Sequence, residues 1–476
     1  MRNRIFGLEI EYGCMPPEGD PSHSPDLISV RAKDQVFGRE GLGFVDTHYR
    51  GRDEPPGNGG FLFNGGRLYL DMGHIEFATP ECRGLFDLVA SDRAGELIVQ
   101  RALSQIKNNS GVSLAETASF FKNNIDHYTG ATFGCHENYL VRREVPFSQR
   151  LLPALLPFFV TRQIFAGAGR VGCHNDVFDS GSPETPCIDF QLSQRADHIV
   201  TEIYQWIQFS RAIINTRDEP LADWGLYRRL HLLVGDSNMS EYVTALKVGT
   251  TAVLIELLEQ EIWPDIRLDN AVDAIRDISR DPTYQWVVQL EDGRHTTAID
   301  LQLTYLELAE RHLRGREPEI DWVLREWRFV LEALAVDPMS LIDRLDWVAK
   351  KWLLQSFIEA EGLDWQDPWV QSLDLEYHNL NPAKGLYFDL RSRGMTKKVV
   401  DDERVNLAMV TPPQDTRARA RSSVMRSLTN HKARYVIEWD SIYVEDEKYL
   451  NLDDPFQTYD LEIEEFVREF QRPSPD

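Results

Sequence analysis

The chain has 476 residues, a formal net charge of −25 and 42% hydrophobic residues. That hydrophobic content is enough for a large folded core, and it excludes a chain that is disordered throughout. The strong negative charge argues against general binding to nucleic acids or to anionic membranes, although a local basic pocket could still hold a phosphate ligand. A simpler reading, that the charge keeps the protein soluble, stays open.

The five cysteines form no CxxC pair, which argues against a disulfide framework and a zinc knuckle. The first residues, MRNRIFGLEIEYG, do not resemble a secretory signal, and the longest apolar patch, residues 151–160, is too short to span a bilayer. We therefore expect a soluble cytoplasmic protein.

The N-terminal part of the chain has the period-two pattern of β-strands. Residues 5–13 alternate so that Glu9 and Glu11 share one face of a strand. Residues 14–60 are rich in proline, glycine and aspartate and predict a loop excursion. Strand character resumes over residues 61–79, and a further strand pair is expected at 122–124 and 133–141.

The middle of the chain is predicted to be mostly helical. Apolar residues recur at helical spacing in the segments 85–107, 147–165, 197–209, 223–261, 300–314, 319–334 and 343–361. A polar loop is expected at 171–189. The character changes near residue 400, where a turn leads into a basic helix, a strand at 436–444 and a terminal helix. We predict two domains, residues 1–400 and 401–476.

Two rows of charged side chains suggest chemistry on a sheet. Arg67, Tyr69 and Asp71 are spaced two apart, so they project from one face as Glu9 and Glu11 do. Carboxylates that face one space repel each other unless cations lie between them, and oxygen ligands suit Mg²⁺ together with substrate phosphates. The alternative is an ordinary solvent-facing side of an antiparallel sheet. A Mg²⁺–nucleotide site is favoured by the second row and by two further segments, HENYL at 136–140 and YRRLH at 227–231.

Six motifs resemble one known family, the Pup ligases and Pup deamidases/depupylases. They are GLEIEYG at 7–13, NGGRLYLDMGHIEFATPEC at 64–82, KNNIDHYTGATFGCHENYL at 122–140, INTRDEPLADWGLYRRLHLLVGDSNMSE at 214–241, LKVGT at 246–250 and TPPQDTRARAR at 411–421. The resemblance covers residues 4–457. It implies an α+β, glutamine-synthetase-like fold: a curved antiparallel sheet packed by helices, with a small C-terminal domain.

The resemblance also implies a site on that sheet for ATP and Mg²⁺. It places Asp71 as the catalytic base. The implied metal positions are Glu9, Tyr69, Glu76, Glu137 and His231, with Glu11 a weaker candidate. The implied nucleotide-contacting positions are Arg67, Thr79, Asn138, Arg229 and Trp439. Arg217, Asp218 and Glu219 are read as structural ion pairs near the site.

Two activities are implied by the family. A ligase phosphorylates the C-terminal glutamate of Pup, or of a Pup-like modifier, and joins it to a lysine of a target protein, whereas the hydrolase relative cleaves that isopeptide bond or deamidates a C-terminal glutamine. Cys135 and the segments 160–163, 237–241, 416–421 and 454–456 look like ligase versions. The short spacing from Asp71 to Glu76 and the segments 167–172, 337–350, 384–387 and 439–441 look like hydrolase versions. We favour the ligase.

The expected partners are a small disordered modifier and lysine-bearing target proteins, with no nucleic acid and no membrane. The protein is expected to be a monomer, as members of the family mostly are. The basic segment 417–434 has two readings that stay open: one wall of a groove for an acidic modifier, or a solvated basic helix.

Overall fold

The computed structural model describes residues 1–17, 24–50, 54–107, 111–126, 130–172, 188–205, 211–429, 434–445 and 448–470. Most of the polar loop predicted at 171–189 lies outside these residues. Among the described helices, none is both long and apolar enough to cross a membrane.

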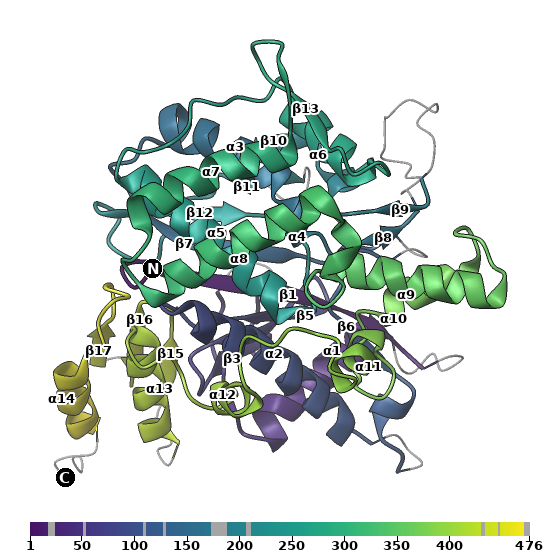
Figure 1. Cartoon of the computed structure of the whole chain (residues 1–476). Helices are drawn as coiled ribbons and strands as arrows, with labels where there is room; N and C mark the ends of the chain where they lie inside the picture. The colour runs from purple at the N-terminus through teal and green to yellow at the C-terminus, as the bar shows by residue number, and fades with distance from the viewer. Residues whose placement is uncertain are drawn as a thin grey trace, which may run out of the picture.

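A ten-stranded sheet is the centre of the molecule (Figure 1). Its strand order is β10-β11-β12-β7-β1-β5-β4-β3-β2, and β6 pairs with the end of β1. The pairings are antiparallel except for β10 with β11, which is parallel. The strands are β1 (Phe6–Met15), β2 (Gly43–Val45), β3 (Gly59–Leu62), β4 (Arg67–Asp71), β5 (His74–Ala78), β6 (Ser119–Phe121), β7 (Cys135–Arg142), β10 (Thr201–Tyr204), β11 (Ala212–Asn215) and β12 (Tyr227–Leu232).

Helices pack against this sheet, as the predicted α+β class requires. The first group is α1 (Pro25–Asp34), α2 (Leu85–Gln105), α3 (Leu152–Thr161), α4 (Gln163–Ala166), α5 (Glu241–Glu259) and α6 (Ala271–Arg280). The second is α7 (Ala298–Leu313), α8 (Pro318–Val336), α9 (Asp346–Glu361), α10 (Pro368–Glu376), α11 (Leu386–Ser392) and α12 (Asp402–Ala408). Two small hairpins, β8 (Arg170–Val171) with β9 (Phe190–Gln191) and β13 (Val287–Gln289) with β14 (His295–Thr297), complete this part.

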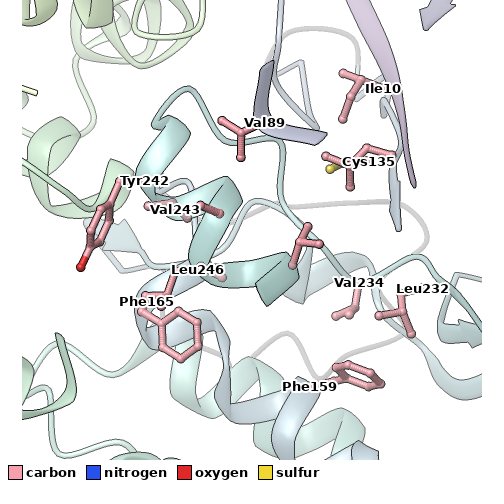
Figure 2. Close-up of a cluster of buried hydrophobic side chains, with 14 of the residues drawn as sticks. Ile10, Val89, Cys135, Phe159, Phe165, Leu232, Val234, Tyr242, Val243 and Leu246 are labelled. Carbon is pink, nitrogen blue, oxygen red and sulfur yellow. The ribbon is translucent and has the colours of Figure 1, made fainter. Parts of the chain in front are cut away.

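One face of the sheet, the back face, is apolar and covered by helices. Ile10 of β1, Cys135 of β7 and Leu232 of β12 are each at most 1% exposed. Figure 2 shows them in one cluster with Val243 and Leu246 of α5. Burial of this face is what fixes the register of the strands, because a slip of one residue would turn the apolar set outward.

Several sequence predictions were wrong about local structure. Residues 14–60 are more than a loop, since they contain the end of β1, helix α1, a π-helix at Gln35–Arg39 and strand β2. The described part of the helix predicted at 197–209 is a 3-10 turn at Ala196–His198 followed by strand β10, and residues 206–209 lie outside the described residues. The helix predicted at 223–261 begins only at Glu241, because residues 227–232 form β12. Residues 122–124 follow strand β6, which pairs with β1 and not with β7.

The helices predicted at 85–107, 147–165, 300–314, 319–334 and 343–361 are confirmed, with ends that differ by a few residues. The last part of the chain forms a small module beside the sheet (Figure 1), with α13 (Arg417–Leu428), β15 (Tyr435–Ile437), β16 (Ser441–Val444), β17 (Lys448–Asn451) and α14 (Asp460–Phe470). Its apolar cluster contains Phe61 of β3, whereas Val405 belongs to the large core. The core division therefore falls after α12. The predicted boundary near residue 400 stays a prediction.

A buried ion triad fixes the small module to the rest of the molecule. Arg421 donates to both carboxylate oxygens of Glu81, at 2.6 and 3.1 Å, and Arg417 donates to the same carboxylate at 2.7 Å. Both arginines are at most 3% exposed. The two cations lower the pKa of Glu81 to about 2, although burial alone would raise it. Helix α13 is thus basic, as predicted, but these two arginines face inward and not toward a solvated surface or groove.

Replacing Arg421 with methionine should destabilise the protein by about 3 kcal/mol, since a buried carboxylate loses one of its two partners. Arg419→Met is the matched control on the same helix, because Arg419 is 39% exposed in its side chain and pairs with the exposed Asp460. It should cost less than about 1 kcal/mol. Urea unfolding of the two variants measures both values, and equal losses would contradict the assignment.

Candidate functional site

The other face of the sheet, called the front face here, carries the predicted site. Residues paired across antiparallel strands project from the same face. Asp71 pairs with His74, and Tyr69 pairs with Glu76, which pairs in turn with Glu11. In the next row, Arg67 pairs with Ala78, Ala78 with Glu9, and Glu9 with His136. In the row after that, Gly7 pairs with Asn138, and Asn138 with His231. The register alone therefore gathers these side chains from strands β1, β4, β5, β7 and β12.

Glu9, His136 and His231 form the first group on the front face. Their possible ligand atoms all lie within 4.8 Å of one another. Glu9 Oε2 is 3.4 Å from His136 Nδ1 and 3.8 Å from His231 Nε2, and Asn138 Nδ2 donates to Glu9 Oε1 at 3.1 Å. His231 is 5% exposed, yet neither of its ring nitrogens has a hydrogen-bond partner among the residues that the structure describes. Burial and Arg229 hold the pKa of His231 well below its usual value, so the ring is neutral and able to bind a metal.

Glu11, Asp71 and Glu76 form the second group, again with ligand atoms within 4.8 Å of one another. Burial and the charge of Glu11 raise the pKa of Glu76 well above its usual value. The same two causes raise the pKa of Asp71. Tyr69 donates a 2.5 Å hydrogen bond to Glu76. A divalent cation would relieve the repulsion in this group, so its oxygen donors fit Mg²⁺, while the two histidines of the first group also suit softer metals such as Zn²⁺.

The predicted nucleotide-contacting residues lie around these groups. Arg67 is 5% exposed and donates to Asp46 and Glu54, at 2.9 and 2.7 Å. Thr79 follows β5 directly, and its hydroxyl accepts a bond from the backbone of Leu8. Arg229 is the front-face residue of β12 next to His231.

Trp439 reaches the front face from the small module. Its ring packs edge-on against Phe61, with centroids 4.9 Å apart, and Phe61 pairs with Arg67 across β3 and β4. The Arg421 guanidinium lies 4.9 Å from the Trp439 ring and donates to its carbonyl oxygen. The buried ion triad thus also positions Trp439. The expected ion pairs are present near the site, as Arg217 contacts Glu219 at 2.7 Å and Arg143 contacts Asp218 at 2.9 Å.

Glu137 does not belong to the front face, so its prediction as a metal position was wrong. It pairs with Leu8 and Leu232, which are back-face residues. Glu137 is 0% exposed, and Arg162 donates to its two oxygens at 2.5 and 2.9 Å. The neighbouring His136 takes the front-face position instead. The alternation of side chains along a strand could have found it, because His136 is two residues from Asn138.

Two arginines near Glu11 were also missed by the sequence reasoning. Arg195 is 2% exposed and donates to the carbonyl of Phe133, and Arg211 donates to the hydroxyl of Thr132. Burial and the proximity of Arg211 lower the pKa of Arg195 to about 10. Among the described residues, neither arginine has a carboxylate within ion-pair distance. They offer positive charge to an anion beside the second carboxylate group. Neither arginine belongs to a recognised motif, and the helix wrongly predicted at 197–209 lies between them in the sequence.

The model of the family described as "Pup-ligase protein" matches residues 4–443 of this sequence. The chain belongs to the Pup-ligase family. This confirms the family to which the motifs pointed.

Relatives of both activities are similar to this chain. It is 37% identical to a protein of Rhodococcus erythropolis named Pup--protein ligase 1, over 98% of this chain and 99% of that protein. It is 38% identical to a protein of Acidothermus cellulolyticus named Depupylase, over 92% of this chain and 90% of that one. Identity alone does not separate the two activities.

Solved structures support the fold. The ligase PafA in complex with the ubiquitin-like protein Pup superposes with a TM-score of 0.85 at 34% identity, covering 98% of this chain and 91% of that one. PafA in complex with ADP superposes with a TM-score of 0.79, also at 34% identity, covering 94% of each chain. The α+β fold with a helix-covered sheet is therefore confirmed.

Mg²⁺ should stabilise the protein more strongly at pH 8 than at pH 5.5. The raised pKa values of Asp71 and Glu76 mean that protons and the cation compete for the same oxygens, so affinity rises with pH. In the metal-free protein, the contribution of these two groups to stability has the opposite pH dependence. Asp71 and Glu76 favour the folded state at low pH and cease to do so as the pH rises through their folded pKa values. Each tenfold gain in affinity adds about 1.4 kcal/mol of stability when Mg²⁺ is in excess.

The measurement is the thermal unfolding midpoint with and without Mg²⁺ at both pH values. Glu76→Gln is the control, since it removes one titrating ligand and should flatten the pH dependence. An Mg²⁺ effect that is the same at both pH values in the unaltered protein would contradict the placement of the cation among these carboxylates.

Proposed function

We propose that this protein is an ATP-dependent ligase that joins the C-terminal glutamate of Pup, or of a Pup-like modifier, to lysine side chains of target proteins, and thereby marks them for proteasomal degradation. One observation carries the choice of the ligase over the hydrolase. The chain aligns end to end with the Pup--protein ligases, over 98% of itself and 99% of the relative, whereas its alignment with the depupylases covers 92% of this chain and 90% to 91% of theirs.

The proposed reaction has two steps. The γ-phosphoryl group of ATP passes to the glutamate carboxylate of the modifier, which gives an acyl phosphate and ADP. The amine of the target lysine then attacks the acyl carbon, the C–O bond to phosphate breaks, and an isopeptide bond and inorganic phosphate are formed. Bound Mg²⁺ would supply charge neutralisation for the phosphoryl group in transfer.

The residues of the front face suit these steps. Asp71 is half-buried at the end of β4, and its raised pKa makes it a better proton acceptor than an exposed aspartate. It can therefore attract the lysine ammonium and take its proton before the attack. Arg195 and Arg211 lie beside Glu11 and can balance the charge of the phosphate or of the glutamate. Glu9, Glu11, Glu76, His136 and His231 would hold the metal.

The hydrolase remains the second candidate because of a specific observation. Strands β4 and β5 are joined by only Met72 and Gly73, so the spacing from Asp71 to Glu76 is the short one that resembles the depupylases. The 38% identity to a depupylase is consistent with this reading.

We further propose that the protein acts as a monomer in the cytoplasm, without nucleic acid or membrane as partners. The net charge of −25 supports the last part, since it disfavours binding to polyanions.

The two activities differ in what they consume. With ATP, Mg²⁺, Pup ending in glutamate and a lysine-bearing protein, we expect steady ADP formation that matches conjugate formation one to one. Purified protein that cleaves ready-made conjugates but forms none, with no net ADP release, would establish the hydrolase instead.

Asp71→Asn should abolish conjugation while leaving ATP binding within about threefold, because the base is lost but the other ligands of the front face remain. Isothermal titration with a non-hydrolysable ATP analogue and a conjugation assay test the two halves of this statement. A variant that conjugates at a near-normal rate would remove Asp71 from the mechanism.

A further inference from the structure

The tip of the β4–β5 hairpin carries a methionine in an unfavourable conformation. Asp71 pairs with His74, and the two residues between them have positive φ angles, 47° for Met72 and 91° for Gly73. This combination defines the type I′ hairpin turn, which favours asparagine or aspartate followed by glycine. A methionine at the first position adopts the left-handed region at a cost that asparagine largely avoids.

The fold gives no reason for this methionine. Met72 is 82% exposed, and it belongs to none of the apolar clusters of the described residues. The tip lies against α1, because a Cβ atom on Gly73 would be only 2.8 Å from the Asp26 carboxylate. A strained, exposed apolar side chain at this turn points to a role in contact with another molecule.

Two more exposed apolar side chains lie on elements that pack against β4 and β5. Met15 ends β1 and is 42% exposed, and Leu27 lies in the first turn of α1 and is 48% exposed. Asp26, next to Leu27, lies close to Gly73 at the tip, and together with burial it raises the pKa of Cys14, which precedes Met15. We call Met15, Leu27 and Met72 the tip patch.

The charge around the tip patch indicates what kind of group approaches it. Asp71 directly precedes Met72, and Glu11 and Asp26 are close by. A lysine side chain combines an ammonium group with four apolar methylenes, so it matches carboxylates set behind an apolar rim. Methionine is flexible and polarisable, and it therefore adapts to target surfaces of different shape.

We propose that the tip patch is the docking surface for target proteins, in which Met72 contacts the apolar surroundings of the acceptor lysine and brings its ammonium group to Asp71. The inference rests on the proposed function and adds to it the element that selects a protein acceptor over a free amine. Met72 acts here through binding and takes no part in the chemistry.

The decisive variant is Met72→Asn, which improves the turn and removes the apolar contact. Its thermal midpoint should be equal to or above that of the unaltered protein, so misfolding cannot explain a loss of activity. With Pup ending in glutamate, kcat/KM for a protein acceptor should fall about tenfold, the value expected for one lost apolar side-chain contact. The rates with free lysine or hydroxylamine and the KM for ATP should not change.

Two controls make the test specific. Met72→Leu keeps an apolar side chain on the same strained turn and should retain protein conjugation. Val336→Asn removes an apolar side chain that is 88% exposed at the end of α8, and it should have no effect.

The possible outcomes distinguish a failure of the docking surface from a failure of the proposed ligase function. Met72→Asn with unchanged protein conjugation overturns the docking surface, and so does an equal loss with free lysine, which would mean that the tip affects the chemistry. Unaltered protein that modifies neither kind of acceptor overturns the proposed ligase function itself.

Discussion

Mutual repulsion of carboxylates on one side of an antiparallel sheet is the constraint on which this molecule depends. Glu9, Glu11, Asp71 and Glu76 come from three adjacent strands, and the strand register places all four side chains on the same face. Burial and this repulsion raise the pKa values of Asp71 and Glu76, histidines lie among the carboxylates, and the ligand atoms are close enough together to hold a cation. The opposite face of the same strands packs into the apolar core. A change of register that moved the carboxylates off the front face would therefore expose apolar side chains to water.

Much of the site could be predicted from the sequence where alternation along a strand was plain. Polar and apolar residues alternate over residues 8–12 and 67–71, and both segments lie in the sheet with Glu9, Glu11, Arg67, Tyr69 and Asp71 on one face, as predicted. In HENYL the same alternation places His136 and Asn138 on the front face and Glu137 on the back face. A buried ion pair with Arg162, distant in sequence, is what makes a glutamate tolerable in the core, and no local pattern reveals it.

The wrong helices have a different cause. Ile199, Val200 and Ile203 are spaced as on a helix, but they are β-branched residues that favour strands, and β10 is what forms. In the segment 223–240, the glycines at 225 and 235 bound a strand whose alternation is hidden in a longer apolar run. Arg195 and Arg211 could not be placed without these strands. Their position beside Glu11 arises from tertiary structure alone.

The ion triad of Glu81, Arg417 and Arg421 has a consequence for biosynthesis. Glu81 is made early, whereas its two partners and Trp439 are made more than 300 residues later. A nascent chain on the ribosome therefore carries an unneutralised carboxylate next to β5 until helix α13 has been made, and until then it also lacks Trp439 at the front face. The front face is therefore completed only when synthesis of the chain is almost finished.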